Sequence, residues 1–355
     1  MITDEIIKEV NLSGAIEIKE PIKNLKPILE LYDKDYLIDF YYSITKKQLN
    51  SNKQNLITKL YKLLTNENII KNFISTLIDE EYNEVIRIIT NKGSIQDNYI
   101  EYKLYSCLKN FGLVHTFNYN SNLYIVIPDE IMTILNNIEI DKLTTKIKEN
   151  TKTVKLAYSM VNLYGVVPLD LYLDCYGKFY RKPNSEKDFE CVFFPERINS
   201  IRLFDTSENL YFTKEEFLDE AYDEAMTKKI TCKYEDCLFN YDFKEISLED
   251  LLNYYDNYYY EETKAVKEFK NYLKKKKLSD DTINSIISNI IQSFRIDYDN
   301  GIFFLNEMFE DDNYEINNSN IDEILPYINN IVNNIPMWGN KGWTNKEIIL
   351  KECFK

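Results

Sequence analysis

A change of hydrophobic period at Gly112 constrains this chain more than any other feature of its sequence. Before it, apolar residues recur at helical spacing in Tyr82–Ile89 and again in Tyr99–Leu108. After it, the alternation typical of strands appears in Leu113–Phe117 and Leu123–Ile127, on either side of polar turn residues. A further helical pattern follows. The sequence therefore predicts helix, helix, β-hairpin and helix, in that order.

This order of elements resembles that of a winged-helix unit, which we expect at residues 79–140. In such a unit a helix ahead of the hairpin can enter the major groove of DNA. That helix is expected at Asn98–Asn110, where Lys103 and Lys109 are accompanied by two acidic neighbours. Winged-helix units also dock onto proteins, and the sparse positive charge of this helix favours that alternative.

A second stretch, residues 141–213, repeats the pattern of helix, turn, helix and short strands, and we expect a second winged-helix-like unit there. A Lys-rich helix leads to the turn Tyr164–Pro168. The extended segments expected after this turn are Phe189–Phe194, Ser200–Phe204 and Leu210–Phe212. The two stretches share no visible sequence identity, so the similarity is one of pattern alone.

The length of 355 residues predicts two or three domains. Only 8 Gly and 8 Pro, with many Leu, Ile, Lys and Glu, favour a mainly α fold with small β-hairpins, in which winged-helix-like units accompany a helical bundle. We expect an N-terminal arm and a helical module at residues 1–78, and an acidic helical domain at residues 214–355. Within the arm, a short helix, a break at Gly14 and an extended piece around Pro21 and Pro27 are expected.

Three helical runs follow the arm: Leu31–Tyr42, Leu49–Leu64 and Glu67–Ile78. The middle part, ITKKQLNSNKQNLITKLYKLL, resembles the SAP and Rho-N-terminal group of small helical modules, with Asn and Ser replacing the glycine often found in their link. The resemblance implies nucleic-acid binding by the lysines of this part, which are Lys46, Lys47, Lys53, Lys59 and Lys62. The alternative is that these lysines are the solvated faces of amphipathic helices.

The net charge of −15 opposes non-specific binding to nucleic acid, because phosphates are bound by Lys and Arg. The charge is unevenly distributed. Residues 214–262 hold fifteen Asp and Glu against five Lys, whereas residues 44–78 hold six Lys against Glu67 alone. The two halves of the chain are therefore expected to face different partners, or each other.

The six cysteines are scattered, which is typical of reduced thiols in a cytoplasm rather than of a disulfide framework. Cys232 and Cys237 have a spacing at which two thiolates can share a zinc ion, and Cys175 and Cys191 are the candidates for further ligands. Buried or free thiols are the expectation, and no cofactor is predicted. His115 is the only histidine, and we expect it to be an ordinary hairpin residue.

The remainder of the chain is predicted to be helical, with helices capped at Thr213–Glu216 and Ser247–Asp250. Residues 251–278 are expected to form one long helix or a broken pair. A cluster of tyrosines between residues 254 and 260 favours a packing seam over a ligand cage.

The segment IPMWGNKGWTNKEI is the most distinctive motif of the chain. It resembles the tail N-x-P-x-W-x-N-x-G-x-T-P-x-E-L of uncharacterised bacterial proteins, some of which carry a Cys-rich SEC-C metal-binding motif that this chain lacks. The matching residues are Asn334, Pro336, Trp338, Asn340, Gly342, Thr344 and Glu347, with Asn345 in place of the usual proline. A tight turn, two tryptophans and a capping box predict a structural clasp formed by Pro336, Trp338, Gly342, Trp343, Thr344 and Glu347.

No motif for phosphoryl transfer, dinucleotide binding, zinc proteolysis or serine hydrolysis occurs in the sequence, and its carboxylate pairs lie in charge-dense stretches. The sequence predicts a non-catalytic interaction or regulatory protein that binds another protein, soluble in the cytoplasm and without a membrane segment. The alternative is a nucleic-acid-binding protein with a role in transcription. A metal hydrolase, the third reading, would require stoichiometric metal in the purified protein.

Overall fold

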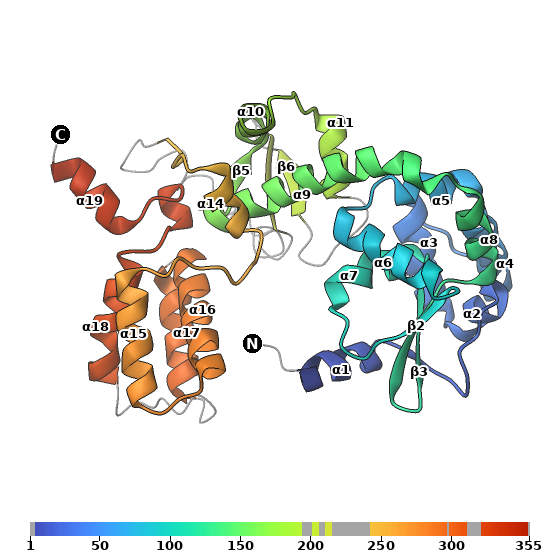
Figure 1. Ribbon diagram of the computed structural model, residues 1–355, viewed down its shortest axis with the longest axis horizontal. Helices are drawn as coiled ribbons and strands as arrows, with labels where there is room; N and C mark the ends of the chain where they lie inside the picture. The colour runs from blue at the N-terminus through green and yellow to red at the C-terminus, as the bar shows by residue number, and fades with distance from the viewer. Residues whose placement is uncertain are drawn as a thin grey trace. The chain divides into compact units, whose positions relative to one another are not determined.

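The computed structural model describes residues 4–193, 201–205, 210–214, 242–296, 298–310 and 321–353. Within them the chain is mainly helical with two small sheets, so the predicted mainly α class is confirmed (Figure 1). The chain divides into two compact units. We call Ile2–Val154 with Glu186–Ser200 the N-terminal unit, and Lys155–Ser185 with Ile201–Lys355 the C-terminal unit. None of the described helices is long and apolar enough to cross a membrane.

Helices make up most of the N-terminal unit. Its elements are α1 (Asp4–Ser13), β1 (Ile16–Glu17), α2 (Leu25–Leu31), α3 (Lys34–Thr45), α4 (Lys53–Leu64), α5 (Glu67–Ile74), α6 (Asp79–Thr90), β2 (Ser94–Gln96), α7 (Tyr102–Phe111), β3 (His115–Tyr119), β4 (Asn122–Val126), α8 (Asp129–Asn137), η1 (Ile140–Leu143), α11 (Glu186–Phe189) and η2 (Glu190–Val192). The long helix α9 (Thr144–Tyr164) belongs to this unit up to Val154 and to the C-terminal unit from Lys155.

The sheet of the N-terminal unit has the strand order β1-β3-β4-β2, in which β1 runs parallel to β3 and the other neighbours are antiparallel. The predicted hairpin is confirmed as β3 and β4, which pair along their whole lengths. Asn120 and Ser121 form its turn with φ of 51° and 57°, the left-handed conformation that matches the twist of paired strands.

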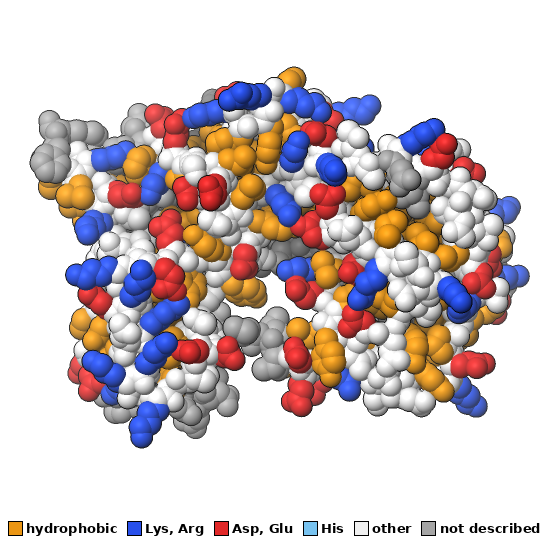
Figure 2. All heavy atoms as spheres, in the orientation of Figure 1, with side chains coloured by type: hydrophobic (Ala, Val, Ile, Leu, Met, Phe, Trp, Pro, Cys, Tyr) orange, Lys and Arg blue, Asp and Glu red, His pale blue; other side chains and the backbone are white. Residues whose placement is uncertain are grey.

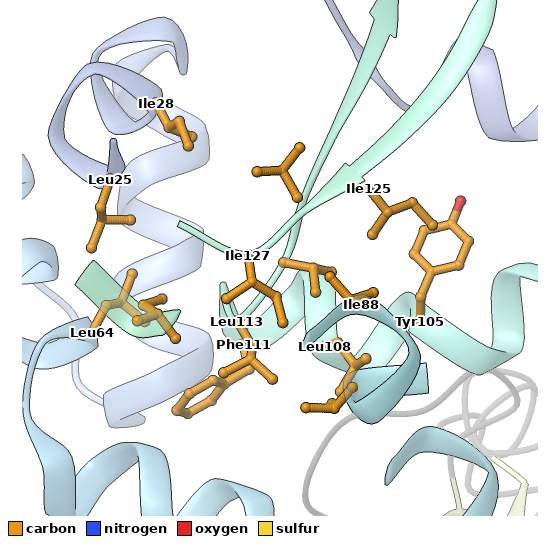
Figure 3. Packing of buried hydrophobic residues seen from close by; sticks show 14 of the residues in the cluster. Leu25, Ile28, Leu64, Ile88, Tyr105, Leu108, Phe111, Leu113, Ile125 and Ile127 are labelled. Carbon is orange, nitrogen blue, oxygen red and sulfur yellow. The ribbon is translucent and has the colours of Figure 1, made fainter. Parts of the chain in front are cut away.

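One hydrophobic core runs through the N-terminal unit, from Leu25 in α2 to Ile138 after α8. In Figure 3, side chains from α2, α4, α6, α7 and the hairpin converge on this core. The helices expected to form a module at residues 1–78 and the elements expected to form a unit at residues 79–140 therefore share it. Because their apolar faces are buried against each other, the boundary predicted after Ile78 does not divide the core.

The N-terminal arm packs onto this core through α1 and β1. The buried Asn11 side chain donates to the carbonyls of Asn98 and Ile100 and accepts from the hydroxyl of Tyr105. Pro27, which was expected in an extended piece, lies in the first turn of α2 instead. That turn tolerates proline because its backbone N–H groups have no partner inside the helix.

The C-terminal unit contains the second sheet, a helical bundle and the tail. Its elements after α9 are β5 (Val167–Pro168), α10 (Leu169–Tyr180), β6 (Ile201–Asp205), β7 (Leu210–Lys214), α14 (Leu248–Asn253), α15 (Lys264–Lys275), α16 (Asp280–Ile296), α17 (Tyr298–Glu310), α18 (Ile321–Val332), η5 (Trp338–Asn340) and α19 (Asn345–Cys353). Helices α15 to α18 enclose a second core that includes Phe269, Ile287 and Ile328, and Figure 1 shows them side by side. The expected long helix after Ser247 is thus a broken pair, α14 and α15.

Both sheets are built on one repeated connectivity of helix, strand, helix and hairpin. The first copy comprises α6, β2, α7, β3 and β4, and the second comprises α9, β5, α10, β6 and β7. In each copy the first strand pairs antiparallel with the last, which gives the orders β2-β4-β3 and β5-β7-β6. The repeat expected from the sequence is therefore present in the topology. Its assignment to the winged-helix fold stays a prediction.

Two local predictions for this region are wrong. Phe189–Phe194 was expected to be extended, but its residues up to Val192 form α11 and η2, because the buried Phe189 and Val192 have the spacing of a helical turn. Thr213 was expected to cap a helix, but it lies in β7 and its hydroxyl donates to the carbonyl of Gly165. The acidic helix expected after it lies outside the described residues.

We predict that Gly112→Ala destabilises the N-terminal unit by about 3 kcal/mol or more. Gly112 ends α7 with a φ of +82°, and an added Cβ would lie 2.1 Å from Cζ of the buried Phe40. Both the left-handed backbone and the collision oppose any side chain there. Urea denaturation, with hydrogen exchange read separately in each unit, measures the effect.

The matched control is Gly177→Ala inside α10, where an added Cβ meets nothing within 4 Å. This change should stabilise the helix by about 1 kcal/mol, since alanine favours helix over glycine. Equal effects of the two substitutions would contradict the role of Gly112.

Candidate functional site

The lysines predicted to bind nucleic acid lie at the end of α3 and along α4, which pack against each other. Lys46 is the left-handed C-cap of α3, and its ammonium lies 5.8 Å from the centre of the Tyr42 ring. Lys47 is exposed next to it. The ammonium of Lys53 donates to the carbonyl of Glu30 in the last turn of α2, at 2.9 Å. This bond satisfies an open helix-end carbonyl, so Lys53 supports the fold.

Lys62 lies on the exposed face of α4, and Lys59 lies on its half-buried flank. The structure therefore brings the predicted lysines onto neighbouring helices, as a binding surface would require. On the face shown in Figure 2, however, Lys and Arg side chains lie interspersed with Asp and Glu over the N-terminal unit. A track of phosphates is bound best by cations that are not interrupted by carboxylates.

The helix expected to enter a DNA groove is α7, and other elements enclose it. Residues 105–108 of α7 are buried, and α3 and α6 pack against the helix. Lys103 forms an ion pair with Glu101 at 2.6 Å. Lys109 donates to the carbonyl of Gly14 at 2.5 Å, and burial lowers the pKa of its ammonium. Neither lysine is presented as an unopposed cation for a phosphate.

His115 in β3 is buried, with 1% of its surface exposed. Its Nδ1 lies 2.9 Å from the hydroxyl of Tyr32, which is itself buried. Burial, together with the charge of Lys109, lowers the pKa of His115 from 6.5 to about 3. The ring is thus a neutral member of the core, which agrees with the expectation of an ordinary hairpin residue.

The tail after α18 folds back as a turn against α9. Pro336 and Thr344 pair as an antiparallel bridge, with η5 between them. The indole of Trp338 lies over Gly165, where an added Cβ would be 2.6 Å from the ring. Its Nε1 donates to the carbonyl of Asn162 at 3.1 Å. The tryptophan is therefore held both by close packing and by a buried hydrogen bond.

Tyr164 makes the reciprocal contact to the tail. An added Cβ at Gly342 would lie 2.7 Å from the Tyr164 ring, so each segment provides one glycine and one aromatic ring. The Tyr164 hydroxyl donates to the carbonyl of Lys244 at 2.7 Å. The ring also meets Phe243 edge to face at 5.2 Å.

The capping box expected at the start of α19 is present. The backbone N–H of Glu347 donates to the Thr344 hydroxyl at 3.1 Å, and the N–H of Thr344 donates to the Glu347 carboxylate at 2.9 Å. The ammonium of Lys244 donates to both carboxylate oxygens at 2.8 and 3.0 Å. Asn345, which stands where the tails that this segment resembles have proline, accepts from the amide of Asn340 at 2.7 Å.

The carboxylate of Glu347 is partly buried. Burial alone would raise its pKa, but the hydrogen bonds from Lys244 and from the Thr344 backbone outweigh burial and hold the pKa below the usual value of 4.5. Two ammonium groups lie near the centre of the Trp343 ring, that of Lys244 at 5.6 Å and that of Lys351 at 3.1 Å, and the Trp343 Nε1 donates to the carbonyl of Asp242 at 2.9 Å. The motif residues of the tail thus bond to their own chain, as a clasp would.

The candidate zinc ligands are not assembled among the described residues. Cys175 lies in α10 and Cys191 in η2, whereas Cys232 and Cys237 lie outside the described part of the chain. In that part, no group of three or more His, Cys, Asp and Glu side chains could hold a metal ion. Burial raises the pKa of the Cys175 thiol, which disfavours the thiolate that metals bind.

Sequence reasoning missed two buried polar residues of the C-terminal unit. The amide of Asn162 donates to the carbonyl of Tyr254 at 2.7 Å and to the side chain of Asn257 at 3.0 Å. Arg295 is 1% exposed, and its Nη2 donates to the carbonyl of Tyr259 at 3.1 Å. The available signal for Arg295 was a single charge in the apolar run IISNIIQSFRI.

Comparison with known proteins adds no assignment. No protein-family model matches the sequence, and neither the curated proteins nor the solved structures contain a match.

We predict that the imidazole of His115 stays neutral from about pH 8 down to about pH 4. As the only histidine, it gives ring-proton NMR signals that need no assignment by mutation. Because its folded pKa lies below the unfolded value of 6.5, protonation favours the unfolded chain. The contribution of the neutral His115 ring to the free energy of unfolding is therefore fully present above pH 6.5, and it is lost as the pH falls toward 3.

His115→Gln keeps a hydrogen-bonding group for Tyr32 without a titrating ring. This variant should lose less stability than the natural protein over that pH range. An imidazole that titrates near 6.5 would contradict the burial of His115.

We predict that Glu347→Gln destabilises the C-terminal unit at neutral pH and does so less in acid. The folded pKa of Glu347 lies below 4.5, so its ionised carboxylate stabilises the fold above that pH, and this contribution is lost as the pH falls further. Urea denaturation at about pH 7 and about pH 3 measures the difference. Glu268→Gln, which removes an exposed partner of Lys264 at 3.7 Å, is the control and should change little at either pH.

Proposed function

We propose that this chain is a non-catalytic interaction protein whose partner is another protein. The observation that carries the proposal is the enclosure of α7. In a DNA-reading unit of this connectivity, the helix before the hairpin presents its side chains to the groove. Here α1, α3 and α6 cover that helix, and its two lysines are bonded to Glu101 and to the carbonyl of Gly14.

Exposing α7 would break contacts that belong to the core. Asn11 bonds to the Tyr105 hydroxyl and to two backbone carbonyls, and Phe40 lies against Gly112. Removing α1 would leave the buried Tyr105 hydroxyl without Asn11 as its partner, which costs about 1–3 kcal/mol. A rearrangement of this kind is expensive, so the covered state of α7 is the working state.

The overall charge is compatible with a protein partner of opposite sign. A net charge of −15 repels phosphate backbones and attracts basic surfaces over the screening length of the solution. Electrostatic attraction of this kind mainly raises the rate of association, and it weakens as salt is added. We therefore assign the partner to the class of proteins with a basic surface.

The second candidate function is nucleic-acid binding through Lys46, Lys47, Lys59 and Lys62. It is favoured by one observation, the placement of these lysines on two helices that pack together. Nucleic-acid binding through these lysines does not require α7. The enclosure of α7 therefore does not count against this second candidate function, and it can be tested separately.

The test compares the full-length chain with two variants of equal charge. In the first, Lys46, Lys47, Lys59 and Lys62 are changed to Ser. In the matched control the same change is made at four exposed lysines elsewhere in the N-terminal unit, which are Lys19, Lys23, Lys26 and Lys71. Binding to heparin and to duplex DNA is measured at low salt.

We expect no retention that depends on the first four lysines. Cross-linking of the tagged chain in extract of its own host should instead recover basic proteins, with a yield that falls as salt is raised. DNA retention that is lost in the first variant and kept in the control would overturn the proposal in favour of nucleic-acid binding.

A further inference from the structure

A polar stripe crosses the otherwise apolar inner face of α16. Ser288, Gln292 and Arg295 occupy positions i, i+4 and i+7, which lie on one side of a helix. This side meets the connector, by which we mean Tyr254–Tyr260 between α14 and α15. The Ser288 hydroxyl donates to the carbonyl of Tyr258 at 3.3 Å, and Arg295 donates to the carbonyl of Tyr259.

Arg295 uses only part of its donor capacity. Its Nη2 is hydrogen-bonded, and its guanidinium lies 5.2 Å from the centre of the Tyr254 ring. Its Nε and Nη1 are buried and have no hydrogen-bond partner in the described part of the chain. A guanidinium remains charged in proteins, so this is a buried cation with open donors.

Gln292 has an open donor in the same place. Its Nε2 is buried and lacks a partner among the described residues. Gln292 and Arg295 are three positions apart on α16, so the two side chains leave neighbouring positions on one face of the helix. Unpaired buried donors each cost about 1–3 kcal/mol, and more when charged. Open donors on both side chains together indicate a hydrogen-bond acceptor that binds Arg295 and Gln292 at once.

The carboxylate of Glu261, just after the connector, does not fill this role. It accepts from the Tyr254 hydroxyl at 3.0 Å and takes no hydrogen bond from the open Nε and Nη1 of Arg295. It does supply one negative charge to the neighbourhood. A monoanion is therefore tolerated between Arg295 and Gln292 more readily than a dianion, because of repulsion from Glu261.

We propose that Arg295 and Gln292 form a binding site for a carboxylate group, covered by the connector. A carboxylate offers two oxygens in a plane, which match the planar donors of a guanidinium and leave one acceptor for the neighbouring amide. The buried Tyr254 ring beside the guanidinium keeps water away from these bonds and so strengthens them.

The connector is the layer through which a ligand enters. It has neither helix nor strand, and after the buried Tyr254 its residues 255–260 are half-buried or exposed. Besides the hydrogen bonds from Asn162, Ser288 and Arg295, its tyrosines make contacts with the rings and side chains around them. Segments with few buried apolar contacts and irregular backbone open at the lowest free-energy cost. Entry of a carboxylate therefore couples to local opening of residues 255–260 and does not require the bundle to unfold.

The test uses the Arg Nε–H signals of the ¹⁵N-labelled full-length chain, because Nε is one of the open donors. The chain has few arginines, and the signal of Arg295 is identified by its loss in Arg295→Lys. Acetate and a short peptide with a free C-terminus are titrated to about 100 mM, where even a millimolar site is saturated. Sodium chloride and sodium phosphate at equal ionic strength are the comparison series.

We expect the Arg295 signal to shift saturably with acetate, and with the peptide if the ligand is a chain terminus, while chloride leaves it unchanged. The Arg87 signal, whose Nε lies 2.8 Å from Glu84, is the internal control and should not move. Gln292→Leu removes one donor and keeps Arg295, so it should weaken acetate binding about tenfold.

Other results overturn the proposal. An Arg295 signal that is insensitive to acetate and to the peptide excludes the site. A shift of equal size with phosphate excludes the assignment to carboxylates. Full binding by Gln292→Leu excludes the amide as part of the site. Arg295→Met, compared with the natural chain by hydrogen exchange, reports separately whether the guanidinium is needed for folding.

Discussion

Two aromatic rings packed against two glycines hold the tail of the C-terminal unit to α9. Trp338 covers Gly165 and Tyr164 covers Gly342, at distances that leave no room for a Cβ at either glycine. Burying such rings contributes about 1.5–3 kcal/mol each. Because the indole N–H and the phenol hydroxyl both reach carbonyl oxygens, the rings are buried without unpaired polar atoms. The capping box and the bond to Lys244 then set the direction of α19.

The same segment of α9 connects the tail to the tyrosine-rich connector. Asn162 accepts from Trp338 with its carbonyl and donates to Tyr254 with its amide, and the ring of Tyr254 lies against Arg295. Polar groups that share partners in a buried network support one another, and removal of one leaves the next unsatisfied. This explains why the tyrosines at residues 254–260, expected as a packing seam, surround polar rather than purely apolar groups.

In the N-terminal unit, burial decides the role of residues whose type points elsewhere. Lys109 has the sequence context of a DNA-contacting lysine, and Lys53 that of a nucleic-acid module, yet both amines bond to backbone carbonyls of neighbouring segments. The shared core places α1 over α7 and so turns a potential reading surface into an internal one. A binding surface of the N-terminal unit must therefore be formed by exposed side chains other than these.

The sequence by itself determined the local elements. The period change at Gly112 predicted the hairpin, the Tyr164–Pro168 turn predicted the second copy of the pattern, and the spacing of Thr344 and Glu347 predicted the capping box. These features depend on residues close together in the chain, so they are readable from it. Only the tertiary structure decided that α2 to α8 share one core, that Lys109 bonds to Gly14, and that Arg295 is buried under the connector. Such facts depend on segments far apart in sequence, and hydrophobic patterning shows which face of a helix is buried but not against which partner.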